Sequence, residues 1–94
     1  MIEAAGDRLE VSGPLTLGSA KQMLEAGCTQ LGSREQVIFD LAKVHEVDSS
    51  GLTVIFGWVR AARRLGKPVR ISNPPQNLLS LARLYGVTEL LPLA

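Results

Sequence analysis

The fold is decided by Val37-Ile38-Phe39-Asp40-Leu41 and, a few residues later, Asp48-Ser49-Ser50-Gly51, where an apolar run gives way to a helical pattern beginning at Leu52. A run without polar alternation predicts a strand covered on both faces, as in the interior of a parallel sheet. We therefore expect residues 37–41 to be the central strand. Open α/β sheets place their functional loops beyond the carboxyl ends of such strands. Residues 48–51, called the hinge below, are therefore the candidate site.

The rest of the chain supplies further strands and helices around this unit. Alternating polar and apolar residues predict a hairpin over residues 2–11, turning at Gly6-Asp7, and a short strand over 69–72. Apolar residues at helical spacing predict helices over 20–31, 52–65 and 76–85. Ser19 and Gln22 have the spacing of a capping box at the start of the first helix. The prediction is one α/β domain over residues 1–94, with a mixed sheet of about four strands and three main helices.

Composition narrows the classes of function. Residues 1–48 carry four Lys/Arg against eight Asp/Glu and residues 49–94 carry six against one, so the two halves have net charges of −4 and +5. This asymmetry favours complementary faces or a charged partner, but no aromatic residues are interleaved with the basic ones as in nucleic-acid interfaces. The single Cys28 forms no internal disulfide and falls on an apolar helix stripe, so we interpret it as a buried thiol. No Cys/His cluster has metal-ligand spacing, and no segment has the pattern of a signal peptide or membrane span.

The helix predicted after the hinge has two apolar stripes. One stripe contains Leu52, Ile55, Phe56, Val59 and Ala62; the other contains Val54, Trp58, Ala61 and Leu65. Thr53, Gly57, Arg60 and Arg64 lie on one flank between them. One stripe must face the sheet, and the other is either covered by neighbouring helices or exposed to a partner. In the second case Trp58 would be the anchor of the interface.

Ser49 is the hinge residue best suited to a chemical role. A serine just before a helix caps free backbone amides, and the same helix end favours an anion such as a phosphate. Catalysis would require a base and an oxyanion site, and His45 is the one candidate base nearby. Neither a Gly-x-Ser-x-Gly elbow nor a phosphate-binding loop is present. We therefore expect a recognition surface and no enzyme activity.

The sequence resembles a STAS domain in three segments: residues 37–41, Val47 to Leu52, and Gly66-Lys67-Pro68-Val69. STAS domains include the bacterial anti-sigma factor antagonists, in which the first serine of Asp-Ser-Ser/Thr-Gly is phosphorylated by an anti-sigma kinase to release the partner. Ser49 occupies that position here. The resemblance implies a sheet with helices packed against it and function through regulated protein binding.

The ending Leu81-Ala82-Arg83-Leu84-Tyr85-Gly86-Val87 and Leu90-Leu91-Pro92 resembles MlaB-type members of this family. These small subunits bind MlaF, the cytoplasmic ATPase of the ABC transporter that moves phospholipids between the membranes of Gram-negative bacteria. The resemblance implies a MlaF-like partner, or alternatively an anti-sigma kinase, with no cofactor, nucleic acid or membrane insertion. It also implies a cytoplasmic subunit, held at the inner membrane through the complex. The expected contact residues are Asp48, Ser49, Ser50, Gly51, Val54, Trp58, Arg60, Ala61 and Arg64.

Overall fold

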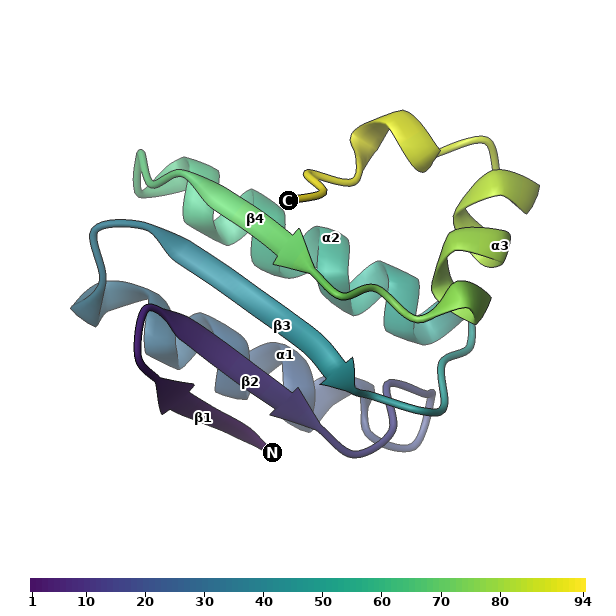
Figure 1. Ribbon diagram of the computed structural model, residues 1–94, viewed down its shortest axis with the longest axis horizontal. Helices are drawn as coiled ribbons and strands as arrows, with labels where there is room; N and C mark the ends of the chain where they lie inside the picture. Colours follow the sequence, from purple (N-terminus) through teal and green to yellow (C-terminus); the bar gives the residue numbers. More distant parts are fainter.

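A four-stranded mixed sheet forms the middle of the molecule, and the computed structural model describes all residues 1–94 (Figure 1). The strands lie in the order β1-β2-β3-β4, where β1 and β2 are antiparallel and β2, β3 and β4 are parallel. Their bounds are β1 Ile2–Ala5, β2 Arg8–Ser12, β3 Val37–Lys43 and β4 Val69–Ser72. The α/β class, the hairpin and the number of strands are confirmed.

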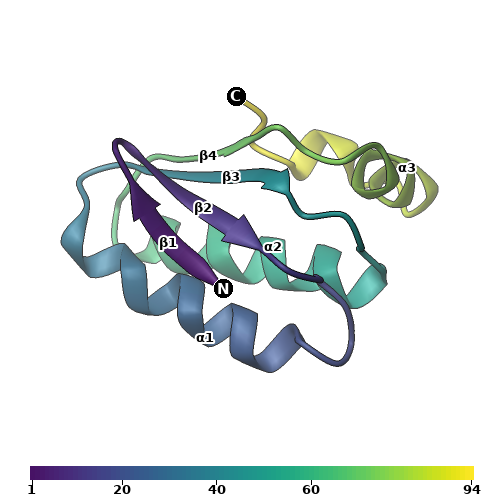
Figure 2. The same cartoon turned by 60° about the horizontal axis from the view of Figure 1, so that its bottom comes forward.

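Three α-helices accompany the sheet: α1 Ala20–Gln30, α2 Ser49–Arg64 and α3 Gln76–Leu84. Two 3-10 turns, η1 Leu31–Ser33 and η2 Thr88–Leu90, follow α1 and α3. Figure 2 shows α1 and α2 side by side against one face of the sheet, with α3 beyond the carboxyl ends of β3 and β4. The hinge therefore lies at the end of the molecule where α2 begins and α3 approaches it.

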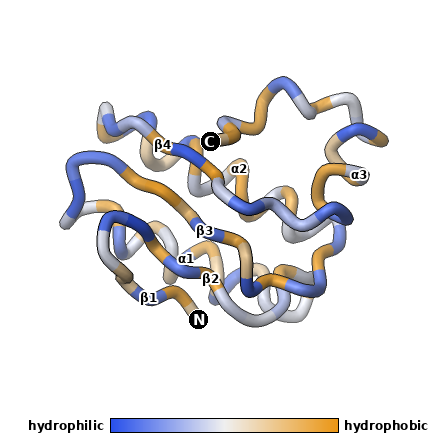
Figure 3. The backbone as a smooth tube through the Cα atoms, viewed as in Figure 1, coloured by the Kyte–Doolittle hydropathy of each residue, from blue (hydrophilic) through white to orange (hydrophobic).

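The central position of β3 is confirmed, but its predicted burial on both faces is wrong. Val37, Phe39 and Leu41 are buried against the helices, whereas Ile38 and Asp40 are half-buried on the opposite face. The apolar run colours the first part of β3 orange in Figure 3, and polar residues follow it. No helix lies across the second face, because α1 and α2 both pack on the first (Figure 2).

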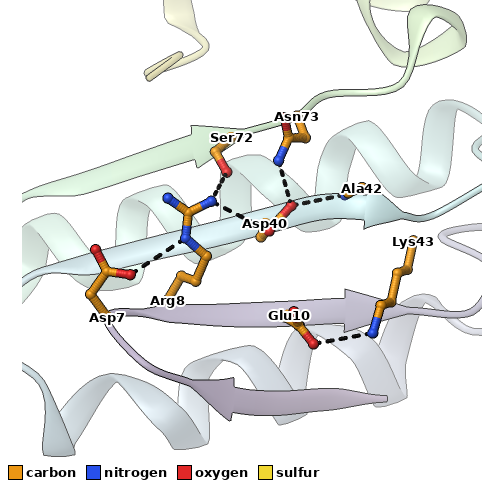
Figure 4. Close-up of polar contacts among 8 residues, drawn as sticks. All are labelled: Asp7, Arg8, Glu10, Asp40, Ala42, Lys43, Ser72 and Asn73. Atoms are coloured by element: carbon orange, nitrogen blue, oxygen red, sulfur yellow. Dashed lines mark hydrogen bonds and ion pairs between the residues drawn. The ribbon is translucent and has the colours of Figure 1, made fainter.

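The open face of the sheet carries a polar network centred on Asp40 (Figure 4). Arg8 donates from Nη1 to Asp40 Oδ2 at 3.4 Å and to Ser72 Oγ at 3.1 Å. Asn73 Nδ2 and the Ala42 amide each donate to Asp40 Oδ1 at 3.0 Å. Desolvation alone would raise the pKa of Asp40, but the hydrogen bonds from Asn73, Ala42 and Arg8 outweigh it and lower that pKa. Asp40 is thus held by donors from three strands or strand ends of the sheet.

Both apolar stripes of α2 contribute to the core. Trp58 has 0% exposure, stacks on Phe39 with ring centroids 4.4 Å apart, and donates from Nε1 to the Met23 carbonyl at 3.0 Å. Val54 is also buried. The close approach of α1 depends on Gly27, because a Cβ there would overlap the Trp58 indole. The prediction of a partner face anchored by Trp58 and Val54 is therefore wrong, since α1 already covers them.

Glycines follow the ends of α2 and α3, whereas the capping box predicted at the start of α1 is absent. Gly66 and Gly86 adopt φ values of +69° and +70° after α2 and α3, the left-handed conformation that ends a helix. Ser19 makes no side-chain cap to α1. Its hydroxyl donates to the Pro14 carbonyl at 2.6 Å and accepts from the Thr16 amide at 3.1 Å. The capping-box prediction is wrong because the preceding loop uses this hydroxyl.

Candidate partner-binding site at the hinge

Asp48 holds the hinge together. Its Oδ1 accepts hydrogen bonds from the Ser50 and Gly51 amides at 2.8 and 3.2 Å, and its Oδ2 accepts one from the Leu17 amide at 3.0 Å. The bond from Leu17, followed by those from Gly51 and Ser50, lowers the pKa of Asp48 against the effect of desolvation. Asp48 is therefore the N-cap of α2, and the prediction that Ser49 caps the helix is corrected by one residue.

The loop before α1 is fixed to the hinge by backbone contacts. Leu15 pairs with Val47 in an isolated parallel bridge, and the Asp48 amide donates to the Leu15 carbonyl at 3.2 Å. A Cβ on Gly51 would overlap that same carbonyl oxygen. The close approach of the Leu15 backbone therefore requires a glycine at position 51, and these contacts hold the loop against the start of α2.

Ser49 is the first residue of α2 and is exposed. Its hydroxyl takes no part in the hydrogen bonds that hold the hinge. Thr53, one turn further along, is also exposed and donates from Oγ1 to the Ser49 carbonyl at 3.2 Å. A free hydroxyl on a rigid helix start can make a contact or receive a modification without altering the fold.

Helix α3 provides a second wall beside Ser49. Asn77 Nδ2 donates to the Val47 carbonyl at 2.8 Å, which holds α3 against the hinge. An open groove between them is lined by Val47, Asp48, Ser49, Asn77, Ser80, Leu81, Leu84 and Tyr85. Leu84 and Tyr85, at the end of α3, are 75% and 56% exposed.

Across the hinge, the side chain of Leu17 is 77% exposed while its amide is bound to Asp48. Exposed apolar residues therefore lie beside Ser49 in the groove, and a further one, Leu17, is held next to Asp48 by its backbone. Leu17 and Asn77 belong to no local motif, and the motif that contains Leu84 did not indicate that this side chain lies beside the hinge. Only the folded chain brings the three segments together.

The predicted contact residues along α2 divide by burial. Arg60 and Arg64 are exposed, Ala61 is half-buried, and Val54 and Trp58 belong to the core. The ion pairs of the chain join Arg8 to Asp7 and Asp40, and Lys43 to Glu10, so they leave the arginines of α2 unpaired. Within the hinge, Ser49 is exposed, Asp48 and Ser50 are half-buried, and Gly51 is buried. A partner can therefore reach Ser49 and the exposed arginines of α2, whereas Gly51 is covered by the loop before α1.

Other candidate residues contribute no chemistry to the hinge. Cys28 is half-buried against the core, and desolvation raises the pKa of its thiol. His45 is exposed and makes no side-chain hydrogen bond with hinge residues. No group of three or more His, Cys, Asp or Glu side chains gathers into a metal site. None of the helices combines the length and apolar character needed to cross a bilayer.

Comparisons with known proteins agree with this architecture. The intermembrane phospholipid transport system binding protein MlaB of Haemophilus influenzae is 34% identical over 53 residues. The aligned stretch covers 56% of this chain and 50% of that relative, so the chain spans half the length of the curated relative that it matches.

Solved structures share the fold at low sequence identity. The unphosphorylated anti-sigma factor antagonist SpoIIAA has a TM-score of 0.72 at 16% identity, over 100% of this chain and 86% of its own. A putative anti-sigma factor antagonist from Thermotoga maritima has a TM-score of 0.77 at 14% identity, over 99% and 83%. The model of the family described as MlaB, STAS domain, matches residues 2–92. The chain therefore belongs to the MlaB STAS-domain family.

Proposed function

We propose that this chain is a non-catalytic subunit that binds and regulates the cytoplasmic ATPase of an ABC transporter that moves phospholipids and maintains outer-membrane lipid asymmetry. The observation that carries the proposal is the exposed Ser49 hydroxyl on a rigid hinge, beside exposed apolar side chains of α3 and the loop before α1. Membership in the MlaB family and the name of the Haemophilus relative support the transporter setting. In that setting the chain would lie at the cytoplasmic side of the inner membrane, attached through the complex.

The character of the surface supports protein binding. Leu17, Leu84 and Tyr85 keep more than half of their area exposed around the hinge. Clustered exposed apolar residues are costly in water and mark interaction sites on folded domains. The surrounding exposed Thr53 and Arg60 supply polar contacts of the kind found at the rim of an interface. A partner that covers the hinge would bury these residues together.

A catalytic role for Ser49 has little support. A serine nucleophile needs a base in hydrogen-bond reach and donors for an oxyanion. The polar groups at the hinge are already used, because Asp48 accepts from three backbone amides to cap α2. Ser49 therefore functions by contact or by modification.

The second candidate function is that of an anti-sigma factor antagonist switched by phosphorylation of Ser49. The exposed Ser49 within Asp48-Ser49-Ser50-Gly51 favours it, as does the fold shared with SpoIIAA. A phosphate would add nearly two negative charges at the start of α2, where the helix dipole tolerates them and a carboxylate-lined partner does not. Mass spectrometry after incubation with the anti-sigma kinases of the same genome tests this. Unmodified Ser49 with every kinase would eliminate it.

The main proposal is tested with the purified chain and the ATPase of the phospholipid transporter from the same genome. We expect the two to co-elute in size-exclusion chromatography and the rate of ATP hydrolysis to change when the chain is added. A matched pair of variants, Ser49→Glu at the hinge and Ser33→Glu on the distant η1 turn, separates a contact at the hinge from a general effect of charge. Failure to co-elute together with unchanged hydrolysis would overturn the proposal.

A further inference from the structure

The groove that begins at Ser49 continues along the whole of α2. Its first section, between the hinge and α3, shares Ser49 and Tyr85 with a second section. That section shares Phe56 and Val87 with a third, which ends at Arg63. After α3 the C-terminal segment returns towards β4, where Leu93 bridges Ile71 (Figure 1). Val87 and Leu90 of this segment line the groove opposite α2.

The floor and outer wall of the far section are apolar. Phe56 and Val59 come from α2, and Val87 and Leu90 come from the segment around η2. Leu90 is 58% exposed, and Phe56 and Val87 are half-buried. These side chains form an apolar trough between two segments of the same chain.

The far end of the trough is cationic. Arg60 and Arg63 line it, and both are exposed. Neither forms an ion pair within the chain, because the ion pairs involve Arg8 and Lys43. Helix α2 itself contains no acidic residue. Two unpaired guanidinium groups beside an apolar trough are complementary to carboxylates on the apolar occupant.

We propose that this groove seats an amphipathic helix of the partner ATPase, whose apolar face fills the trough and whose carboxylates meet Arg60 and Arg63. This inference rests on the proposed function and identifies the chemistry of the partner at the same site. The groove follows α2 from Ser49 to Arg63, a rise of about 21 Å at about 1.5 Å per residue, which matches a helix of roughly four turns. Apolar residues at i, i+3, i+4 and i+7 of that helix would fill the trough.

A helix fits this surface better than a lipid bilayer does. The apolar residues line a hollow between α2 and the segment around η2, which accommodates a rod, whereas a bilayer presents a broad surface. Binding to a lipid surface is nevertheless an outcome that the experiment distinguishes.

The charge part of the proposal is tested by calorimetric titration of the whole chain with the purified ATPase at low and moderate salt. We expect the double variant Arg60→Glu/Arg63→Glu to weaken binding at least about tenfold and to remove most of the salt dependence. The control Arg34→Glu/Arg70→Glu changes the net charge equally at positions away from the groove and should remain within about twofold. Replacing the facing carboxylate of the ATPase with arginine should restore binding to the double variant.

The apolar part is tested with a matched pair of leucines. Leu90 lines the groove and Leu65 lies outside its three sections, and the two are 58% and 56% exposed. We expect Leu90→Gln to weaken binding to the ATPase and Leu65→Gln to leave it unchanged, while both variants keep the circular dichroism spectrum of the wild type.

The outcomes separate this inference from the proposed function. If the wild type binds the ATPase and the groove variants bind equally well, the inference is overturned and the proposed function stands. If the wild type does not bind, both are overturned. If the groove variants lose binding to vesicles of phosphatidylglycerol and phosphatidylcholine but still bind the ATPase normally, the groove is a lipid surface and the inference is wrong.

Discussion

Replacing Trp58 with alanine tests whether the second stripe of α2 is core. The fully buried side chain removes about 200 Å² from water, which corresponds to roughly 5 kcal/mol at about 25 cal/mol per Å² as an upper bound. Measured truncations of buried Phe or Trp to Ala cost about 3–5 kcal/mol. The lost hydrogen bond to the Met23 carbonyl is worth about 1 kcal/mol net and is included in that range. We expect a loss of about 4 kcal/mol, a large share of the roughly 5–14 kcal/mol typical of a domain this size.

The assay is equilibrium urea unfolding followed by far-ultraviolet circular dichroism, because the chain has a single tryptophan and the variant loses that fluorophore. Trp58→Phe is the matched control. It retains a ring to stack on Phe39 and loses the Nε1 donor, so we expect a cost of about 1–2 kcal/mol. If Trp58→Ala lowers the free energy of unfolding by less than about 1 kcal/mol, the reasoning is refuted, because removing a core tryptophan destabilises a fold by more than that.

Three further predictions concern the hinge. Asp48→Asn keeps a capping acceptor but removes the carboxylate whose pKa is lowered in the fold. The ionised carboxylate stabilises the fold above about pH 4, and this stabilisation is lost as the pH falls through the lowered pKa of Asp48. The wild type should therefore melt higher than Asp48→Asn near neutral pH, and the difference should shrink in acid; a constant gap would contradict this. Gly51→Ala should cost about 1–3 kcal/mol, because the new methyl meets the Leu15 carbonyl, whereas Gly32→Ala meets nothing within 4 Å and should be close to neutral; equal melting temperatures would contradict the close approach. Ser49→Glu should weaken ATPase binding with little change in melting temperature, since the site is exposed and a helix start tolerates a negative charge; unchanged binding would remove Ser49 from the interface.

Local patterns were sufficient to predict the elements and their order. The apolar run before the hinge, which predicted the central strand, and the hairpin turn at Gly6 are short-range signals, and both are confirmed. The N-cap of α2 was misplaced by one residue because Asp48 and Ser49 are both good capping residues. The choice depends on the Leu17 amide, which comes from a distant loop.

Tertiary contacts determine the features that local sequence patterns did not predict: the burial of the second stripe of α2, the open face of the sheet and the groove beside Ser49. The second stripe of α2 is buried because Gly27 allows α1 to reach Trp58, and a glycine on the apolar stripe of a helix is the signal that could have indicated such close packing. The open second face of the sheet was signalled by Asp40 within the apolar run. The groove beside Ser49 had no local signal, since Asn77 joins α3 to the hinge across thirty positions of sequence.

The most direct test of the account is the affinity of this chain for the ATPase of the phospholipid transporter in its own genome, measured by calorimetry for the wild type and for Ser49→Glu. The account predicts a complex with the wild type that Ser49→Glu weakens markedly while both proteins unfold at similar urea concentrations. Absence of binding by the wild type, or equal affinity for the two proteins, would contradict a partner-binding site at the hinge.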